Sequence, residues 1–155
     1  MNILIIEDSK IEAQIFTEAL KRVMDEPLRI HHTMTLADAV ARLQAAADEF
    51  DLVFLDLKLP DSAEWRHTYD AVAPYARRVP VIVMTGENDH DIAREVMKNG
   101  AEDYIVKGGK KRHADMLKET IDFALLRHRQ TRDLAARAAQ NEQCVHWLTG
   151  GYTVE

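Results

Sequence analysis

Five short runs of aliphatic residues recur along the chain, and segments with helical periodicity separate them. The runs are NILII (2–6), LRIHHT (28–33), DLVFL (51–55), VPVIVM (79–84) and DYIVK (103–107). Their length and β-branched content predict strands, and the continuously apolar ones predict strands buried on both faces. Strict alternation with helices favours parallel pairing through right-handed crossovers. The sequence therefore predicts a doubly wound α/β domain with a five-stranded parallel sheet and helices on both faces.

The segments between the runs carry apolar residues at helical spacing. Helices are predicted from about residue 11 to 23, 36 to 43, 65 to 73 and 89 to 98. Ser62 is the predicted cap of the third helix, because serine is favoured at that position. The pair Asn99 and Gly100 predicts a left-handed end for the fourth helix.

The fifth helix is expected to begin near Lys111 and to run past the edge of the domain. At 155 residues the chain has room for one domain and an appended element. Beyond Leu126 strong helix formers persist while large apolar residues become rare, up to Gly150 and Gly151. We therefore divide the chain into a domain of residues 1–126 and a C-terminal helical extension and tail of residues 127–155.

Composition excludes several classes of protein. The formal net charge of −6 argues against nucleic-acid binding, which requires a basic face. The single cysteine, Cys144, cannot form an internal disulfide, and this favours a reducing compartment. The N-terminus lacks the pattern of a signal peptide, and no apolar run approaches the length of a membrane span. A cytoplasmic location with no membrane contact is expected.

Polar residues follow the predicted strands at the points where they end. Glu7 and Asp8 follow the first strand, Asp56 the third, Thr85 the fourth, and Lys107 ends the fifth. The carboxyl ends of parallel strands meet at one edge of a sheet, where such folds bind ligands. Three carboxylates gathered there repel one another unless a hard cation such as Mg²⁺ bridges them. An amine and a hydroxyl at the same edge suit a phosphoryl group, so phosphoryl transfer is the predicted chemistry.

Each of these residues also has a simpler interpretation when taken alone. Glu7 and Asp8 are equally suited to capping the helix that follows them. Thr85 alone is typical of a strand end, and Lys107 alone is typical of a solvated charge. Only the presence of all these residues together, each at the end of a predicted strand, favours a site for a phosphoryl group.

The pattern resembles the receiver domain of two-component response regulators. The resemblance rests on EDS (7–9), DLVFLDLKLPD (51–61), VIVMTG (81–86) and GAEDYIVKG (100–108), and it covers about residues 1 to 126. It implies a flavodoxin-like sheet of order 2-1-3-4-5. One departure is Gly108, which stands where receivers typically carry proline.

The resemblance also implies a role for each site residue. Asp56 would be the phosphoacceptor, Glu7, Asp8, Asp56 and the backbone carbonyl of Lys58 would bind Mg²⁺, and Thr85 and Lys107 would contact the phosphoryl oxygens. Tyr104 would be a switch residue together with Thr85, repacking the surface of the fourth helix, fifth strand and fifth helix. The implied partners are a histidine kinase or phosphotransfer protein and an unknown downstream protein.

Two other functions and one further contact stay open. An adaptor receiver would act without phosphorylation. A Mg²⁺-dependent phosphatase with an aspartate nucleophile usually needs a second aspartate two residues later, where this chain has Lys58. The extension is either a frayed helix or a contact surface, for a partner or for a homodimer, made by Leu134, Ala138, Val145, Trp147 and Leu148.

Overall fold

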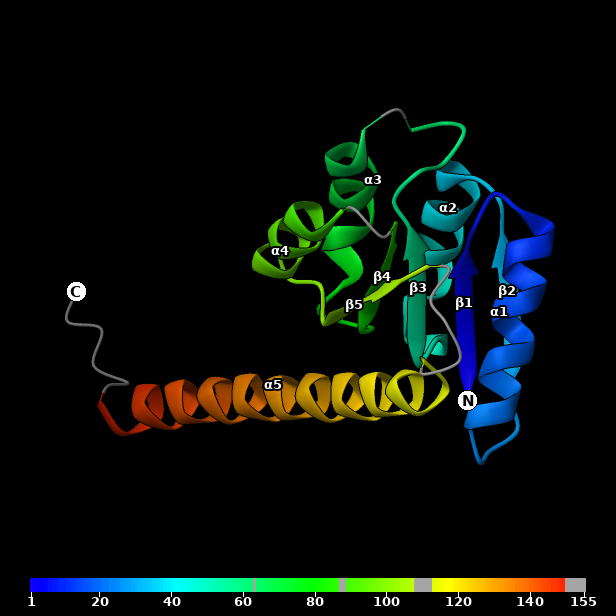
Figure 1. Ribbon diagram of the computed structural model, residues 1–155. Helices are drawn as coiled ribbons and strands as arrows, with labels where there is room; N and C mark the ends of the chain where they lie inside the picture. The colour runs from blue at the N-terminus through cyan, green and yellow to red at the C-terminus, as the bar shows by residue number, and fades with distance from the viewer. Residues whose placement is uncertain (63, 87–88, 108–112, 150–155) are drawn as a thin grey trace.

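The computed structural model describes residues 1–62, 64–86, 89–107 and 113–149. Five parallel strands form one sheet in the order β2-β1-β3-β4-β5, which confirms the predicted fold class (Figure 1). The strands are β1 (Asn2–Ile6), β2 (Arg29–Thr33), β3 (Leu52–Asp56), β4 (Val81–Thr85) and β5 (Asp103–Val106). Neighbouring strands start at similar levels, since Ile3 pairs with Leu52 and Val53 pairs with Val81. Their carboxyl ends therefore reach the same edge of the sheet.

Helices cover both faces of the sheet. The α-helices are α1 (Lys10–Val23), α2 (Leu36–Ala46), α3 (Trp65–Val72), α4 (His90–Lys98) and α5 (His113–Thr149), with 3₁₀ turns at Ala47–Glu49 and Ala73–Tyr75. Alternate residues of each strand point to opposite faces, so Ile3 and Ile5 pack with α1 and α5. Leu4 and Ile6 pack with the helices of the other face. This two-sided burial explains why the central strands are continuously apolar.

Of two helix ends predicted from the sequence, the structure agrees with one and differs from the other. Gly100 follows α4 with a φ of +108°, the left-handed conformation that glycine adopts without strain. The prediction that Ser62 caps α3 was wrong, because Glu64 holds the cap position and no side chain bonds to the first turn. Ser62 lies in the loop that follows β3, and its hydroxyl is instead 2.6 Å from that of Thr68 on α3.

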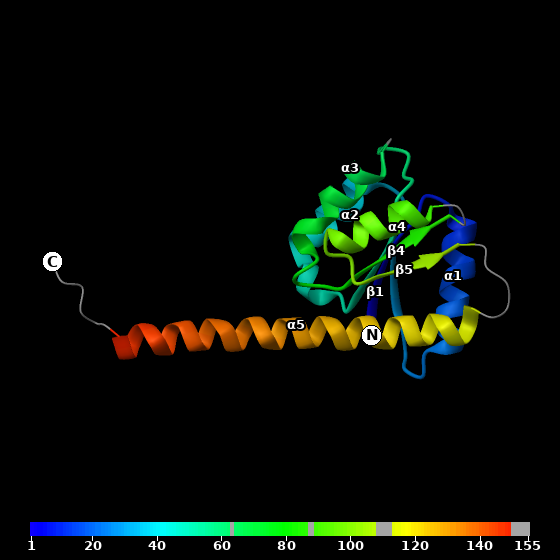
Figure 2. The same cartoon turned by 60° about the vertical axis from the view of Figure 1, so that its left-hand side comes forward.

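The fifth helix leaves the domain as a single rod, with α5 extending far beyond the sheet (Figures 1 and 2). Its predicted start at Lys111, its predicted end at Gly150 and Gly151, and the loop position Gly108 lie outside the described residues. Among the described residues, no helix combines the length and the apolar character needed to cross a membrane.

Candidate functional site

Three acidic side chains meet at the carboxyl edge of the sheet. Glu7 and Asp8 follow β1, and Asp56 is the last residue of the neighbouring strand β3. One carboxylate oxygen from each of the three lies within 4.8 Å of the others. Glu7 and Asp56 are buried, whereas Asp8 is exposed. The structure thus brings together the three carboxylates among the four predicted metal ligands, the fourth being the backbone carbonyl of Lys58.

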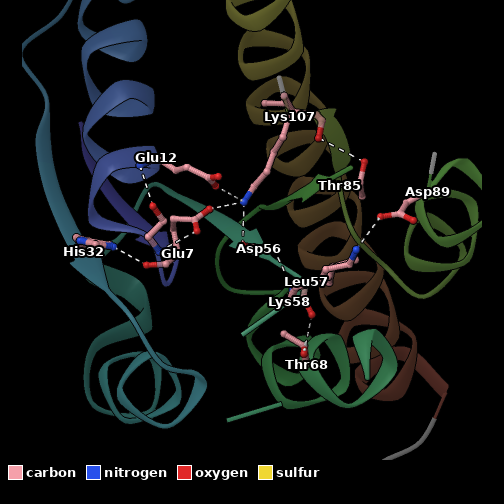
Figure 3. Close-up of polar contacts among 12 residues, drawn as sticks. Glu7, Glu12, His32, Asp56, Leu57, Lys58, Thr68, Thr85, Asp89 and Lys107 are labelled. Atoms are coloured by element: carbon pink, nitrogen blue, oxygen red, sulfur yellow. Dashed lines mark hydrogen bonds and ion pairs between the residues drawn. The ribbon is translucent and has the colours of Figure 1, made fainter. Parts of the chain in front are cut away.

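Lys107 reaches into this acidic group from the end of β5 (Figure 3). Its Nζ donates to Asp56 Oδ2 at 2.8 Å and to Glu12 Oε2 at 2.9 Å, and it also contacts the Glu7 carboxylate. Although burial disfavours its charge, these hydrogen bonds raise the pKa of Lys107 above its ordinary value. The ammonium group therefore stays charged and offsets part of the repulsion between the carboxylates.

Burial dominates the protonation of Glu7. It raises the pKa of the Glu7 carboxyl to about 7, and the hydrogen bonds from Lys107 and from the Ser9 amide oppose that rise only partly. One backbone amide and one imidazole side chain also fix the position of Glu7. The Ser9 amide donates to Glu7 Oε1 at 3.0 Å, and Nε2 of His32 lies 2.7 Å from the Glu7 carbonyl oxygen. These contacts hold Glu7 at the edge of the sheet, beside Asp56.

Capping of α1 does not account for Glu7 and Asp8. Ser9 occupies the cap position, and its side-chain oxygen accepts from the Glu12 amide at 3.2 Å. The side chain of Glu12 is directed to Lys107. The acidic pair before α1 is thus left available at the edge of the sheet.

The loop after β3 is held by hydrogen bonds that begin at Asp56 itself. Asp56 Oδ1 accepts from the backbone amide of Lys58 at 3.0 Å. The Thr68 hydroxyl donates to the carbonyl oxygen of Leu57 at 3.0 Å, which ties the loop to α3 (Figure 3). The Lys58 side chain is directed to the start of α4, where its Nζ lies 3.7 Å from Asp89 Oδ2. That the Lys58 carbonyl binds a metal stays a prediction.

Thr85 and Tyr104 lie near the acidic group without direct bonds to it. Thr85 is buried at the end of β4, and its hydroxyl oxygen lies 3.5 Å from the carbonyl oxygen of Ile105. Its backbone carbonyl accepts from the Lys107 amide at 2.7 Å, which joins the ends of β4 and β5. Tyr104 is half-buried on β5 and packs against the core. Their switching roles stay predictions.

Glu12 and His32 contact the site, although sequence reasoning did not select them. Glu12 stands three residues after Ser9, so the local pattern reads as an ordinary capping box. The partner that Glu12 binds is 95 residues away in the chain. Only the placement of β5 beside the start of α1 would have identified that contact.

The site can do three things chemically. It offers oxygen ligands alone, the donor set that Mg²⁺ prefers. It holds a fixed amine 2.8 Å from one carboxylate oxygen of Asp56, where negative charge would develop on an acceptor group. It also leaves Asp56 at the end of a strand, with its Oδ1 bonded only to a backbone amide among the described contacts. These are the requirements for a carboxylate that accepts a phosphoryl group.

Comparisons with known proteins identify the family of the chain. The family model described as response regulator receiver domain matches residues 3–120. The methanogenesis regulatory protein FilR1 of Methanothrix harundinacea is 30% identical over 138 residues, which are 87% of this chain and 30% of that protein. The regulatory protein LuxO of Vibrio cholerae is 34% identical over 95 residues, which are 61% of this chain and 20% of that protein.

Solved structures share the fold. The crystal structure of the signal receiver domain of a Luxo repressor protein from Vibrio parahaemolyticus has a TM-score of 0.68 and 30% sequence identity. It covers 86% of this chain and 95% of that chain. The present chain spans less than a third of the length of the two curated relatives.

Proposed function

Because the chain belongs to the response regulator receiver domain family, we propose that it is a signalling switch that is phosphorylated on Asp56. The observation that supports the proposal most strongly is the gathering of Glu7, Asp8 and Asp56 within 4.8 Å, with the Lys107 amine on Asp56. Neither helix capping nor solvent exposure explains why two of these carboxylates are buried together. Phosphoryl transfer gives each of the four side chains a role.

Mg²⁺ fits the donor set of this site. Glu7, Asp8, Asp56 and the carbonyl of Lys58 would hold it, since all of them offer oxygen ligands. When bound, it would neutralise the charge that develops on the transferred phosphoryl group. Lys107 already binds two of these carboxylates, so its amine is placed to share that charge.

The transfer itself forms one bond to phosphorus and breaks one. A carboxylate oxygen of Asp56 attacks the phosphorus of a phosphohistidine, the P–N bond breaks, and the imidazole leaves. An acyl phosphate forms on Asp56, and water later hydrolyses it. Lys107 would bind one phosphoryl oxygen, and the Thr85 hydroxyl would leave the carbonyl of Ile105 to bind another. Movement of Thr85 would make room for Tyr104 and change the surface that a partner reads.

Partners follow from this chemistry. The donor would be a histidine kinase or a phosphotransfer protein, since the reaction starts from a phosphohistidine. The output would be contact with a downstream protein through α4, β5 and α5, the elements beside Thr85 and Tyr104. Two-component signalling is the setting in which the family acts.

Incubation with acetyl phosphate and Mg²⁺ tests the proposal without knowledge of the kinase. We expect the intact mass to show one added phosphoryl group per chain, and the product to be labile as acyl phosphates are. Chelation of the metal should prevent the reaction. A chain that takes up no phosphate would be an adaptor that works unphosphorylated. Steady release of phosphate from many substrates would indicate the phosphatase.

The raised pKa of Glu7 predicts a pH dependence of Mg²⁺ binding. With that pKa at about 7, Glu7 is largely protonated at pH 6, and Mg²⁺ must displace the proton. The apparent affinity should therefore rise by about fivefold between pH 6 and pH 7, reach about tenfold by pH 8, and level off above that. Mg²⁺ titrations at pH 6, 7 and 8 measure it. Glu7→Gln, which cannot titrate, should lose this dependence.

A further inference from the structure

More than half of α5, from residue 129 onward, extends beyond the face of the helix that packs on the domain. Up to His128 one face of the helix is buried, through Leu117, Ile121, Ala124 and His128. From 129 to 148 every side chain is exposed, and α5 projects away from the sheet (Figure 2). Isolated helices are only marginally stable in water, and most helical stability in proteins comes from packing of an apolar face. Packing of one face on a second helix would therefore stabilise this segment.

A heptad pattern runs along the projecting segment. Six residues follow one another at alternating spacings of three and four, and all but Thr131 and Asn141 are apolar: Thr131, Leu134, Ala138, Asn141, Val145 and Leu148. We call these six residues the α5 stripe. Leu134 and Leu148 are exposed by 65% and 81%. The spacing places Val145 at an a position and both leucines at d positions, the combination that favours two parallel strands.

The charges beside the stripe are complementary between two copies. In this register Arg137 occupies a g position and Glu142 the next e position, five residues later. In a parallel, in-register pair Arg137 of each copy lies beside Glu142 of the other, which gives two ion pairs by symmetry. Asn141 at a d position adds a polar group to the stripe and lowers the stability of the pair.

The stripe lies on a different side of α5 from the residues that pack on the domain. At about 100° per residue, its centre lies roughly a quarter turn of the helix away from the face that packs on the domain. A second helix can therefore lie along the stripe without displacing any contact of Leu117 or Ile121. The two-fold axis would then put the two domains on opposite sides of the helix pair.

We propose that the α5 stripe forms a parallel two-stranded coiled coil with a second copy of this chain. The inference does not depend on phosphoryl chemistry, because the stripe lies outside the acidic site. The pair would exist with or without a phosphoryl group on Asp56. It would hold two domains at a fixed spacing.

The mass of the full chain in solution tests this proposal. Sedimentation equilibrium of the unphosphorylated protein should show a dimer, and Leu134→Glu should raise the dissociation constant at least about tenfold. Gln143→Glu is the matched control, since it adds the same charge at the outward f position and should leave the dimer intact. Arg137→Glu should weaken the dimer, and adding Glu142→Arg should restore it.

Disulfide cross-linking tests the orientation. In a Cys144→Ser background, Thr131→Cys and Asn141→Cys, made separately, should both cross-link to their own copies under mild oxidation. An antiparallel pair can bring only one of these two positions against itself. A monomer, a trimer, or cross-linking at only one position overturns the proposal. If acetyl phosphate does not label the chain, the coiled-coil proposal is unaffected, since labelling tests the acidic site and sedimentation and cross-linking test α5.

Discussion

Replacement of Asp56 by asparagine is expected to abolish phosphorylation by acetyl phosphate. Asparagine has nearly the shape of aspartate, so the buried end of β3 should keep its structure. The amide, however, is neutral and a poor nucleophile, and it removes one of the three carboxylates that would hold Mg²⁺. Intact mass spectrometry after incubation with acetyl phosphate and Mg²⁺ should find no phosphoryl adduct on Asp56→Asn.

Asp89→Asn is the matched control for this variant. Asp89 lies at the same edge, where it pairs with the Lys58 side chain, but it is not a member of the acidic cluster. This variant should be phosphorylated as fast as the original chain. Phosphorylation of Asp56→Asn at the ordinary rate would show that another residue is the acceptor, and it would refute the proposed mechanism.

Lys107→Met is expected to separate phosphoryl transfer from metal binding. Methionine keeps most of the length of the side chain and removes the charge that contacts Glu7, Glu12 and Asp56. Loss of one donor that stabilises developing charge typically slows a reaction about a hundredfold or more. The rate of phosphorylation should fall by that factor. Mg²⁺ affinity should be kept or increased, because the ion no longer competes with an ammonium group for the carboxylates.

Two measurements on the same protein check that separation. Rates come from the time course of labelling at saturating Mg²⁺, and affinities from titration with the metal alone. Lys10→Met is the control, since Lys10 is an exposed lysine near the acidic edge and is not among the contacts of Lys107. Parallel losses of rate and of Mg²⁺ affinity in Lys107→Met would mean that the lysine only supports the structure of the site.

Strand ends made the fold and most of the site predictable. Each strand is recognisable in the sequence as a short apolar run. Parallel pairing places Glu7, Asp56 and Thr85 at one edge of the sheet, and this does not depend on the conformation of the connecting loops. Helix ends with their own chemistry, such as Gly100, were equally predictable. These features depend on local pattern and on sheet geometry alone.

Contacts that depend on distant packing were not predictable. Ser62 fits a helix cap by composition, but its hydroxyl meets Thr68 inside a loop whose path the sequence does not fix. Glu12 fits a capping box, yet its carboxylate turns to Lys107 because β5 ends beside the start of α1. In both cases a local preference was overridden by a tertiary partner.

A crystal structure with Mg²⁺ and beryllofluoride tests the central claim most directly. Beryllofluoride imitates a phosphoryl group on a carboxylate, so its position identifies the acceptor. We predict beryllium on a carboxylate oxygen of Asp56, Mg²⁺ bound by the carboxylates of Glu7, Asp8 and Asp56, and the Lys107 amine on a fluorine atom. Beryllofluoride on another residue, or Mg²⁺ bound away from these three carboxylates, would contradict the account.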